Sequence, residues 1–259
     1  MTNKIPLSVA IITYNEEANL PKCLDSVDFA DEVVIVDSNS TDKTVEIAKD
    51  RGCRVYVEDW KGFGGQKNSA VSKCKHEWVL SIDADERIPP ETKDAIIETL
   101  KNPKAGAYRF PRKNHLHGRW LRWGDQWPDW QVRLFKKDSG TFEGTVHEQW
   151  RTTGDIGAIK NPIEHYSYRD YHDMILRMDR YSEMAARDFF NSNKTFHSLT
   201  PLVHGIAMFL KIYVLKLGIL DGLDGLVNAF LKASGSFFKY AKAVEMQRFR
   251  GRDGQLTTS

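Results

Sequence analysis

Cysteine is scarce in this chain of 259 residues. The three cysteines, Cys23, Cys53 and Cys74, are odd in number, widely spaced and form no CxxC pair, so the sequence implies neither a disulfide framework nor a zinc site. The first residues lead directly into a predicted strand and contain no apolar stretch of the signal-peptide type. We therefore expect a reduced, cytosolic compartment.

Neither sign of charge predominates. The chain has 37 Lys and Arg against 35 Asp and Glu, and the resulting net charge of +2 argues neither for nor against a polyanionic partner. Repeats and low-complexity tracts are also absent from the sequence. The length suits one large domain, or one domain with an appended extension.

Strand and helix signals alternate along the first hundred residues. Apolar, β-branched runs predict strands at 7–13, 32–37, 54–58 and 78–83. Helical patterns follow them at 17–27, 44–51, 66–73 and 90–100. Continuous apolar strands separated by helices predict a parallel sheet with helices on both faces. Ligands of such sheets bind at the carboxyl ends of the strands, where Thr13, Asp37 and Asp83 lie, so we expect the site at that edge.

The most informative stretch is the predicted strand that ends in Asp83-Ala84-Asp85. Alternate side chains of a strand share a face, so Asp83 and Asp85 converge if the extended backbone continues through Ala84. Carboxylate oxygens suit Mg²⁺ or Mn²⁺, hard cations that bridge phosphate oxygens. An isolated DxD is more often a strand that runs into an acidic turn, so its meaning depends on the other motifs.

Three further motifs accompany the DAD segment in a fixed order: Thr13-Tyr14-Asn15-Glu16-Glu17, Asp37-Ser38-Asn39-Ser40-Thr41-Asp42-Lys43-Thr44 and Lys67-Asn68. In this order and spacing they resemble the family 2 glycosyltransferases, which are inverting enzymes of the nucleotide-binding GT-A fold, over residues 7 to about 165. The VDSNSTDKT, GFGGQKN and VHE segments are most similar to the bacterial lipopolysaccharide-core heptose β-glucosyltransferases. The resemblance implies an α/β fold with a mostly parallel GT-A sheet flanked by helices.

The resemblance also implies roles for the matching residues. The nucleotide sugar would be bound by Thr13, Tyr14, Asn15, Glu17, Asp37, Lys67 and Asp83. Asp85 would ligate a divalent metal, Mg²⁺ or Mn²⁺, with His165 as a further ligand, and the metal would neutralise charge on the departing diphosphate. Two simpler interpretations stay open: Lys67 as a solvated helix lysine, and His165 as a structural histidine.

Inversion by direct displacement needs a carboxylate that takes the proton of the acceptor. In the family this base lies in an acidic motif downstream of the metal motif, and Val146-His147-Glu148 matches that place, so the predicted base is Glu148. Asp125 and Asp129, within GDQWPDW, are the competing candidates. The chain departs from the frequent family pattern at DSNS, which lacks a second aspartate, and at His147-Glu148, which replaces a glutamate-aspartate pair.

Arginines and tryptophans are interleaved in residues 108–137. Tryptophan faces pack against sugar rings, and arginines bind phosphates in a bidentate manner. The predicted acceptor-binding residues are Arg112, Arg122, Trp123 and Trp127, for an acceptor that is both sugar-rich and phosphorylated, as the inner core of lipopolysaccharide is. The same composition also suits single-stranded nucleic acid. The upstream motifs disfavour that interpretation, and we expect no nucleic-acid partner.

The last third of the chain is predicted to be helical, at 171–191, 202–220 and 226–249, with 221–225 as a hinge. Residues 202–220 are apolar and about long enough to span a bilayer, but His204, Lys211 and Lys216 interrupt them. In 226–244, polar residues at helical spacing lie opposite an apolar face that contains Phe230, Leu231, Phe237 and Phe238. A lysine-striped amphipathic helix of this kind predicts an interfacial anchor on anionic lipid. The alternative is a helix packed on the catalytic domain with a solvated lysine face.

We therefore predict a GT-A catalytic domain at 1–168, with a nucleotide-sugar half at 1–105 and an acceptor half at 106–168, and an amphipathic, membrane-associating helical extension at 169–259. The expected activity is transfer of glucose from UDP-glucose to the lipopolysaccharide inner core by a peripheral protein at the inner face of the cytoplasmic membrane. Two rivals remain: a polyprenyl-phosphate glycosyltransferase, whose acceptor phosphate needs no base, and a catalytically silent glycan- or membrane-binding module.

Overall fold

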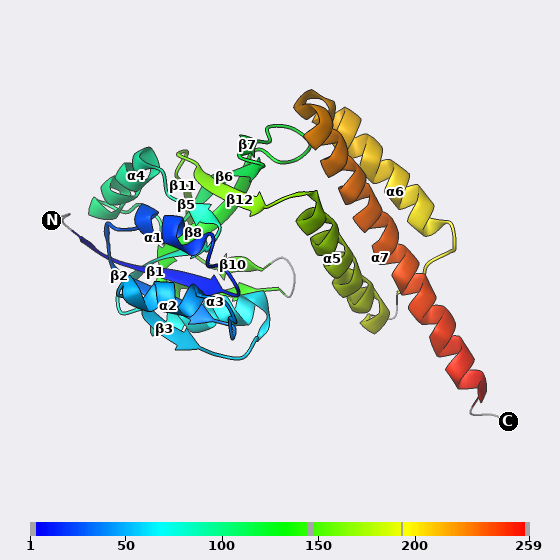
Figure 1. Cartoon of the computed structure of the whole chain (residues 1–259), viewed down its shortest axis with the longest axis horizontal. Helices are drawn as coiled ribbons and strands as arrows, with labels where there is room; N and C mark the ends of the chain where they lie inside the picture. The colour runs from blue at the N-terminus through cyan, green and yellow to red at the C-terminus, as the bar shows by residue number, and fades with distance from the viewer. Residues whose placement is uncertain (1–3, 145–147, 193, 257–259) are drawn as a thin grey trace. The chain divides into compact units, whose positions relative to one another are not determined.

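The computed structural model describes residues 4–144, 148–192 and 194–256, with side chains up to residue 249. The chain forms two compact units (Figure 1). Unit 1 comprises Met1–Asn114 and Pro128–Ser167, and unit 2 comprises His115–Trp127 and Tyr168–Ser259. The sequence placed 115–127 in the acceptor half of the catalytic domain, whereas in the structure this segment belongs with the C-terminal helices.

The first half of unit 1 is a parallel sheet. Its strands are β1 (Ile5–Thr13), β2 (Ala30–Asp37), β3 (Arg54–Val57) and β4 (Trp78–Asp83), in the spatial order β3-β2-β1-β4. The helices between and after them are α1 (Leu20–Ser26), α2 (Thr44–Asp50), α3 (Gly62–Lys73) and α4 (Pro90–Lys101). The predicted α/β class and this parallel arrangement are confirmed.

The strands that follow extend the same sheet. β8 (Asp129–Lys136) pairs antiparallel with β4 and with β6 (Ala107–Leu116), and the path ends with β12 (Ile163–Tyr168) and β5 (Glu86–Arg87). Two short strands, β7 (Arg119–Trp120) and β11 (Ile156–Ala158), pair with β6. β9 (Gly140–Glu143) and β10 (Gln149–Thr152) form a separate antiparallel pair after the short 3-10 turn η1 (Lys137–Ser139).

Apolar cores on the two faces of the sheet fix its register. In β1, Val9 and Ile11 belong to one core and Ala10 to the other, because alternate strand residues point to opposite faces. The second core also holds Phe135 and Trp150, whose rings stack with centroids 3.7 Å apart. A shift of the register by one residue would move the apolar side chains of a strand to the opposite face of the sheet. Burial on both faces therefore fixes the register, and with it the relative positions of the carboxyl ends of the strands.

Unit 2 is built from three helices: α5 (Tyr171–Asn191), α6 (Thr200–Leu210) and α7 (Gly222–Leu256). The π-helical turn η2 (Lys211–Leu215) and the 3-10 turn η3 (Gly218–Asp221) join α6 to α7, and α7 packs against both α5 and α6 (Figure 1). In the described part of the chain no single helix has the length and hydropathy of a membrane span. Thr200–Leu215 and Gly218–Phe249, bent by 70° from each other, meet that criterion only as a pair.

Buried polar contacts hold the 115–127 segment within unit 2. The carboxylate of Asp221 accepts a hydrogen bond from the Trp123 backbone N–H at 2.8 Å, and Gln126 Nε2 donates to Asn228 Oδ1 at 3.0 Å. Asn228 and Asp221 are both buried. The sequence placed Asn228 on a solvated polar stripe of the last helix, and the structure instead uses it as an internal link to this loop.

The amphipathic face predicted for α7 is partly internal. Leu231 is buried, and the side chain of Phe237 lies against Gly205 of α6. On the polar side, Lys242 forms an ion pair with Asp179 of α5 at 2.7 Å. The helix is thus packed, as the alternative interpretation held, but on α5 and α6 of its own unit.

Candidate active site

Three parallel strands bring their last residues to one edge of the sheet. Thr13 of β1 is in register with Asp37 of β2, and Ile12 is in register with Asp83 of β4. The prediction that Thr13, Asp37 and Asp83 share an edge is therefore confirmed. This edge is the natural ligand site of a sheet with this topology.

Hydrogen bonds join the loops that follow β1 and β2. Asn15, with a left-handed φ of 55°, donates its backbone N–H to Ser40 Oγ and accepts from the Thr41 N–H, both at 2.8 Å. Glu17 Oε2 accepts from the Lys43 N–H at 3.1 Å. Asn15 and Glu17 thus hold the two loops together, and their direct contact with a nucleotide stays a prediction.

Asp37 is fully buried beneath these loops. Its carboxylate accepts hydrogen bonds from Thr13 Oγ1 at 2.8 Å and from the backbone N–H of Ser40 at 2.8 Å. In this arrangement Asp37 positions the loop after β2, and its role in binding the nucleotide sugar stays a prediction. Tyr14, in contrast to the buried Asp37, is 60% exposed.

Lys67 links two of the predicted functional carboxylates. Its Nζ lies 2.8 Å from Asp83 Oδ1 and 2.7 Å from Glu148 Oε1. Only 2% of Lys67 is exposed, so its interpretation as a solvated lysine is wrong. Gly64 lets α3 approach the segment that carries Glu148, since a Cβ at Gly64 would lie 3.2 Å from the Gly144 carbonyl oxygen. The other two residues of the VHE motif lie outside the described residues.

The charge network continues from Asp83 to the antiparallel half of the sheet. Arg133 Nη2 of β8 lies 2.7 Å from Asp83 Oδ2 and 2.6 Å from Glu86 Oε1. Glu86 is fully buried, and its other oxygen accepts from the Asp83 backbone N–H at 3.1 Å. Arg112 Nη1 lies 3.2 Å from Glu86 and Arg112 Nη2 lies 2.6 Å from Asp129. Each buried charge therefore has an opposite partner, as its desolvation requires.

The network keeps Asp83 ionised. Burial alone would raise the pKa of this carboxyl, but the charges of Lys67 and Arg133 outweigh burial and hold the pKa well below its usual range. The same pairing acts on Arg133. Burial would lower the pKa of its guanidinium, but the charges of Glu86 and Asp83 outweigh burial and raise the pKa above its usual value. The site thus keeps fixed charges at neutral pH.

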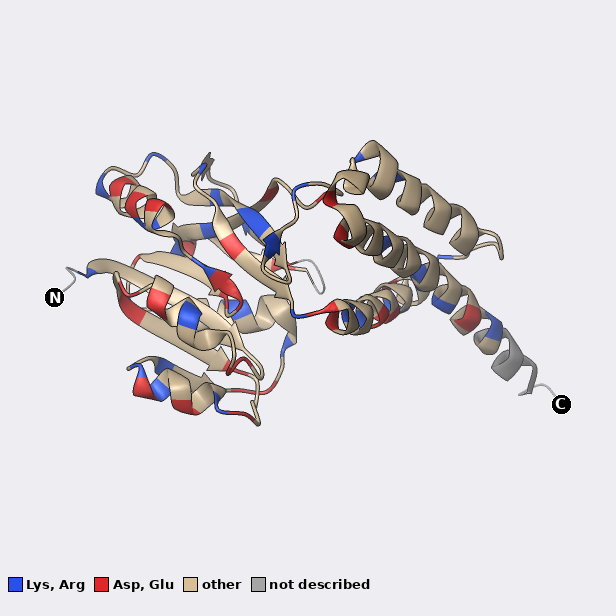
Figure 2. Ribbon diagram, turned by 45° about the horizontal axis from the view of Figure 1, so that its top comes forward, with Lys and Arg blue, Asp and Glu red and all other residues tan. Residues whose placement is uncertain are grey.

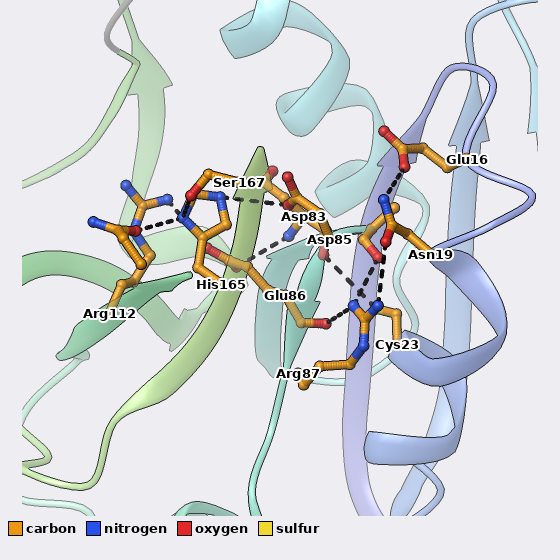
Figure 3. Close-up of polar contacts among 12 residues, drawn as sticks. Glu16, Asn19, Cys23, Asp83, Asp85, Glu86, Arg87, Arg112, His165 and Ser167 are labelled. Atoms are coloured by element: carbon orange, nitrogen blue, oxygen red, sulfur yellow. Dashed lines mark hydrogen bonds and ion pairs between the residues drawn. The ribbon is translucent and has the colours of Figure 1, made fainter. Parts of the chain in front are cut away.

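Asp85 and His165 form the second part of the site (Figure 3). His165 of β12 is in register with Glu86 of β5, and its Nε2 lies 3.5 Å from Asp85 Oδ1. The other ring nitrogen, Nδ1, lies 2.7 Å from Asn114 Oδ1 and 2.9 Å from Ser167 Oγ. Since an amide oxygen accepts, Nδ1 carries the proton toward Asn114, which leaves the lone pair of Nε2 on the side of Asp85.

The chemistry of these donors fits a divalent cation. Five carboxylates and three cations make up the network: Asp83, Asp85, Glu86, Asp129 and Glu148 against Lys67, Arg112 and Arg133. Among the described residues no group of three or more His, Cys, Asp and Glu side chains could hold a metal. Asp85 and His165 are the described side chains that would hold such a cation.

The residues predicted to bind acceptor do not form one group. Arg112 belongs to the network of unit 1, whereas Arg122, Trp123 and Trp127 lie in unit 2. There, Arg119, Trp120, Arg122, Trp123, Leu220 and Asp221 line a cavity of about 410 Å³. The guanidinium of Arg122 lies 4.5 Å from the ring centroid of Trp120, which meets the ring of Trp127 edge-on at 5.2 Å.

The three candidate bases are also separated. Glu148 is bound to Lys67 beside Asp83, and Asp129 is bound to Arg112. Burial would raise the pKa of Asp129, but Arg112 lowers it by more. Asp125 lies in unit 2, is exposed, has a φ of 69° and sits 3.4 Å from Lys216. Of these candidates, Glu148 shares its partner Lys67 with Asp83, a residue predicted to bind the donor.

The family model for glycosyl transferase family 2 matches residues 8–160, which contain every strand of the parallel sheet and the network around Asp83. The chain belongs to this family. The lipopolysaccharide core biosynthesis glycosyltransferase LpsC of Rhizobium meliloti is 30% identical over 93% of this chain and 95% of its own length. An uncharacterized glycosyltransferase of Rickettsia typhi is 31% identical over 93% of this chain and 87% of its own.

Among solved structures, S. aureus TarS in complex with UDP-GlcNAc matches with a TM-score of 0.48 and 16% identity, over 94% of this chain and 92% of that one. The sequence-based resemblance to family 2 glycosyltransferases is confirmed by the family model and by the relatives that match along nearly the whole chain.

The sequence analysis did not assign Arg133 and Glu86 to the candidate active site. Arg133 belonged to the arginine-rich segment, and Glu86 was only the third acid after the strand. The missing information was the antiparallel pairing of β8 with β4, in which Leu134 faces Leu80. The only signal in the sequence was a charged residue, Arg133, within a predominantly apolar strand. Such a residue does not indicate which carboxylate it pairs with.

Proposed function

We propose that this protein is an inverting, metal-dependent glycosyltransferase that transfers glucose from UDP-glucose to the inner core of lipopolysaccharide at the cytoplasmic face of the membrane. The observation that carries the proposal is the buried Lys67 between Asp83 and Glu148 at the carboxyl edge of the sheet. The name and the extent of the match to LpsC support the acceptor class.

The donor would bind across the ends of β1, β2 and β4. Tyr14 is exposed at the end of β1, and Asp83 is held in its charged form at the end of β4. Asp85 and His165 would hold a divalent metal, which when bound supplies Lewis-acid stabilisation of the departing diphosphate. The side chains that surround this position are already paired, so they need little rearrangement when the donor arrives.

Glu148 would take the proton in the transfer step. The acceptor hydroxyl oxygen forms the new bond to the anomeric carbon, the bond from that carbon to the diphosphate oxygen breaks, and the hydroxyl proton passes to Glu148. Lys67 binds Oε1 of Glu148, which orients the carboxylate and leaves Oε2 as the oxygen to receive the proton. Lys67 is thus a positioning residue in this proposal.

The cavity of unit 2 has the chemistry to bind a phosphorylated sugar, the class of acceptor proposed here. Its two arginines suit a phosphate group, and its tryptophans suit the C–H face of a sugar ring. Arg122 and Trp123, which the sequence predicted as acceptor-binding residues, both line it. Trp127 supports the cavity through its contact with Trp120.

A screen of nucleotide sugars tests the proposal directly. Thermal unfolding is measured with UDP-glucose, UDP-GlcNAc and GDP-mannose, each with and without Mn²⁺. A ligand at 100 times its dissociation constant stabilises the native state by about 2.7 kcal/mol, so a specific donor raises the melting temperature. UDP-glucose with Mn²⁺ should give the largest rise, and transfer to a heptose-containing core oligosaccharide should follow. No stabilisation by any nucleotide sugar would favour the silent binding module.

A further inference from the structure

The outer side of α6 carries an apolar stripe. Leu199, Leu202, Val203, Ile206 and Leu210 are each between 50% and 68% exposed. At 100° per residue they fall within an arc of about 100° on one side of the helix. The opposite side is the packed one, since Pro201 and Gly205 are buried and Phe237 of α7 lies against Gly205. Half or more of the surface of each stripe residue is therefore left uncovered by the packing of unit 2.

A second set of exposed apolar residues continues the stripe beyond α6. This end cap consists of Val214, Leu215, Leu217, Ile219, Leu220 and Leu223, each at least 43% exposed. These residues lie in and around the turns η2 and η3, directly after the end of α6. A monomeric soluble protein rarely exposes an apolar patch of this extent without a partner.

The stripe and most of the end cap lie in a segment of the chain without acidic residues, and the acidic side chains that border them are paired, Asp125 with Lys216 at 3.4 Å and Asp224 with Arg119 at 3.6 Å. Residues 189–220 contain no Asp or Glu, but they contain Lys194, Lys211 and Lys216. Lys211 and Lys216 are exposed at the junction of the stripe and the end cap. In Figure 2, α6 is drawn almost wholly in tan, the colour of uncharged residues, whereas α5 and α7 contain both blue basic and red acidic residues. An apolar surface with basic residues at its edge complements a bilayer with anionic headgroups.

The cavity of unit 2 opens beside the same surface. Leu220 belongs to the end cap and also lines the cavity, next to Arg119 and Arg122. Both arginines are exposed, so positive charge borders the end cap on this side as well. A second copy of this chain would bring the same positive charge against itself, and a bilayer with anionic headgroups would not.

We propose that the stripe and the end cap together are a docking surface for an anionic lipid bilayer. This surface lies on the outer side of α6 and the turns that follow it, whereas the anchor predicted from the sequence is the apolar face of α7. The purpose of the surface, access to an acceptor held in the membrane, rests on the proposed function, but the binding itself depends on unit 2 alone.

Vesicle co-sedimentation tests the apolar part of the surface. The full-length protein is mixed with vesicles of phosphatidylethanolamine and phosphatidylglycerol, or of phosphatidylcholine alone, and should pellet with the anionic vesicles. The variant Leu202→Ser/Ile206→Ser/Leu210→Ser should lose at least tenfold in the vesicle partition coefficient. The matched control is Ile175→Ser/Leu176→Ser on α5, which removes two apolar side chains of similar exposure and should bind as the wild type does.

A charge-reversal pair tests the basic part. Each basic residue near an anionic surface contributes about fivefold to the partition coefficient at low ionic strength. Lys211→Glu/Lys216→Glu should therefore lose at least about 25-fold, and added salt should weaken the wild type as well. The control Lys49→Glu/Lys101→Glu reverses two exposed lysines of unit 1 and should change binding by less than twofold.

Three results would overturn the proposal. These are wild-type protein that stays in the supernatant at every salt concentration, equal losses in the stripe variant and its α5 control, or a wild-type dimer that the stripe variant converts to a monomer. The thermal response to UDP-glucose separates this proposal from the catalytic one. A stripe variant that responds normally but does not pellet supports docking, and a wild type that pellets but responds to no donor refutes only the catalysis.

Discussion

Unit 1 buries charge, whereas unit 2 exposes apolar surface. Lys67, Glu86 and Arg133 are almost completely buried in unit 1, and the stripe of unit 2 is at least half exposed. Each arrangement costs free energy, because buried ions lose hydration and exposed apolar groups order water. A fold under selection for stability alone would contain neither. The difference supports the two proposals made above, in which unit 1 carries the chemistry and unit 2 binds the membrane.

Removal of Asp85 should have the largest effect. The Asp85→Ala change takes one of the two donors from the proposed metal site, and a bound metal stabilises the transition state by several kcal/mol. We expect transfer to fall by at least about a thousandfold, with the fold intact. Steady-state transfer and circular dichroism are the measurements, and Asp94→Ala, an exposed carboxylate of α4, is the control. Normal turnover by folded Asp85→Ala protein would remove the basis of the assignment.

The change Glu148→Gln should come next. It keeps the shape of the side chain and removes the basic oxygen, and loss of a general base costs about a hundred- to ten-thousandfold in rate. UDP-glucose binding should persist, because Asp83 and Asp85 are untouched. Asp129→Asn is the informative comparison, since Asp129 is bound to Arg112.

Two outcomes of the Glu148 experiment would change the mechanism. A crippled Asp129→Asn enzyme beside a nearly normal Glu148→Gln enzyme would reassign the base. Full activity of both variants on a polyprenyl phosphate would instead favour the rival reaction, in which the acceptor is already an anion.

Lys67→Met tests how much the buried ion pairs of Lys67 contribute to the stability of the protein. The variant leaves Glu148 and one side of Asp83 without their cation, which typically costs about 3–5 kcal/mol. Urea unfolding measures the loss, and Lys61→Met is the control. Lys61 is half-exposed and pairs with Glu58 at 2.7 Å, so its removal should cost less than about 1 kcal/mol. Equal losses in the two variants would mean that the network contributes nothing to stability.

The same variant predicts a pH dependence. The pKa of Asp83 is lowered in the folded state, so its ionisation stabilises the protein above the unfolded pKa of about 4 and this contribution is lost as the pH falls through the folded pKa. In Lys67→Met the pKa is lowered less, because only Arg133 and Arg112 remain as cations that lower it. The stability difference between wild type and variant should therefore be constant above about pH 5 and shrink below pH 4. A constant difference down to pH 2 would exclude Asp83 as its source.

Much of the fold could be predicted because its signals are local. Each parallel strand is an apolar run bounded by turn residues, and the ends of β1, β2 and β4 could be aligned from these runs alone. The loop at 119–127 could not be placed. Its attachment depends on buried polar pairs such as Gln126 with Asn228, which are 102 residues apart and look like ordinary surface residues in the sequence.

The site divides in the same way. Asp83, Asp85 and Glu148 were predicted from motifs, and the structure brings Asp83 and Glu148 together through Lys67. Whether Asp37 faces a ligand or a loop could not be predicted, because an aspartate at a strand end suits both and only its burial decides. The packing of α7 could not be predicted either, since hydropathy does not reveal that α5 and α6 pack against it, and membrane binding by its exposed Phe230 and Phe238 stays a prediction.

The smallest effect is expected from two glycines of α7. A Cβ at Gly225 would lie 1.9 Å from the Gly218 carbonyl oxygen, so Gly225→Ala must displace the η3 turn and should cost about 1–3 kcal/mol. A Cβ at Gly235 would meet only the flexible side chain of Met178 at 3.3 Å, and Gly235→Ala should gain up to about 1 kcal/mol in helix propensity.

Thermal unfolding and vesicle binding, measured together on these two variants, sharpen the comparison between the units. Gly225→Ala should unfold at a lower temperature and bind anionic vesicles less, because η3 carries Ile219 and Leu220 of the end cap. Its response to UDP-glucose should stay normal, since every residue proposed to bind the donor lies in unit 1. Gly235→Ala should match the wild type in vesicle binding. If Gly225→Ala loses its donor response together with its vesicle binding, the two tasks are not separate, and the units would have to be treated as one functional body.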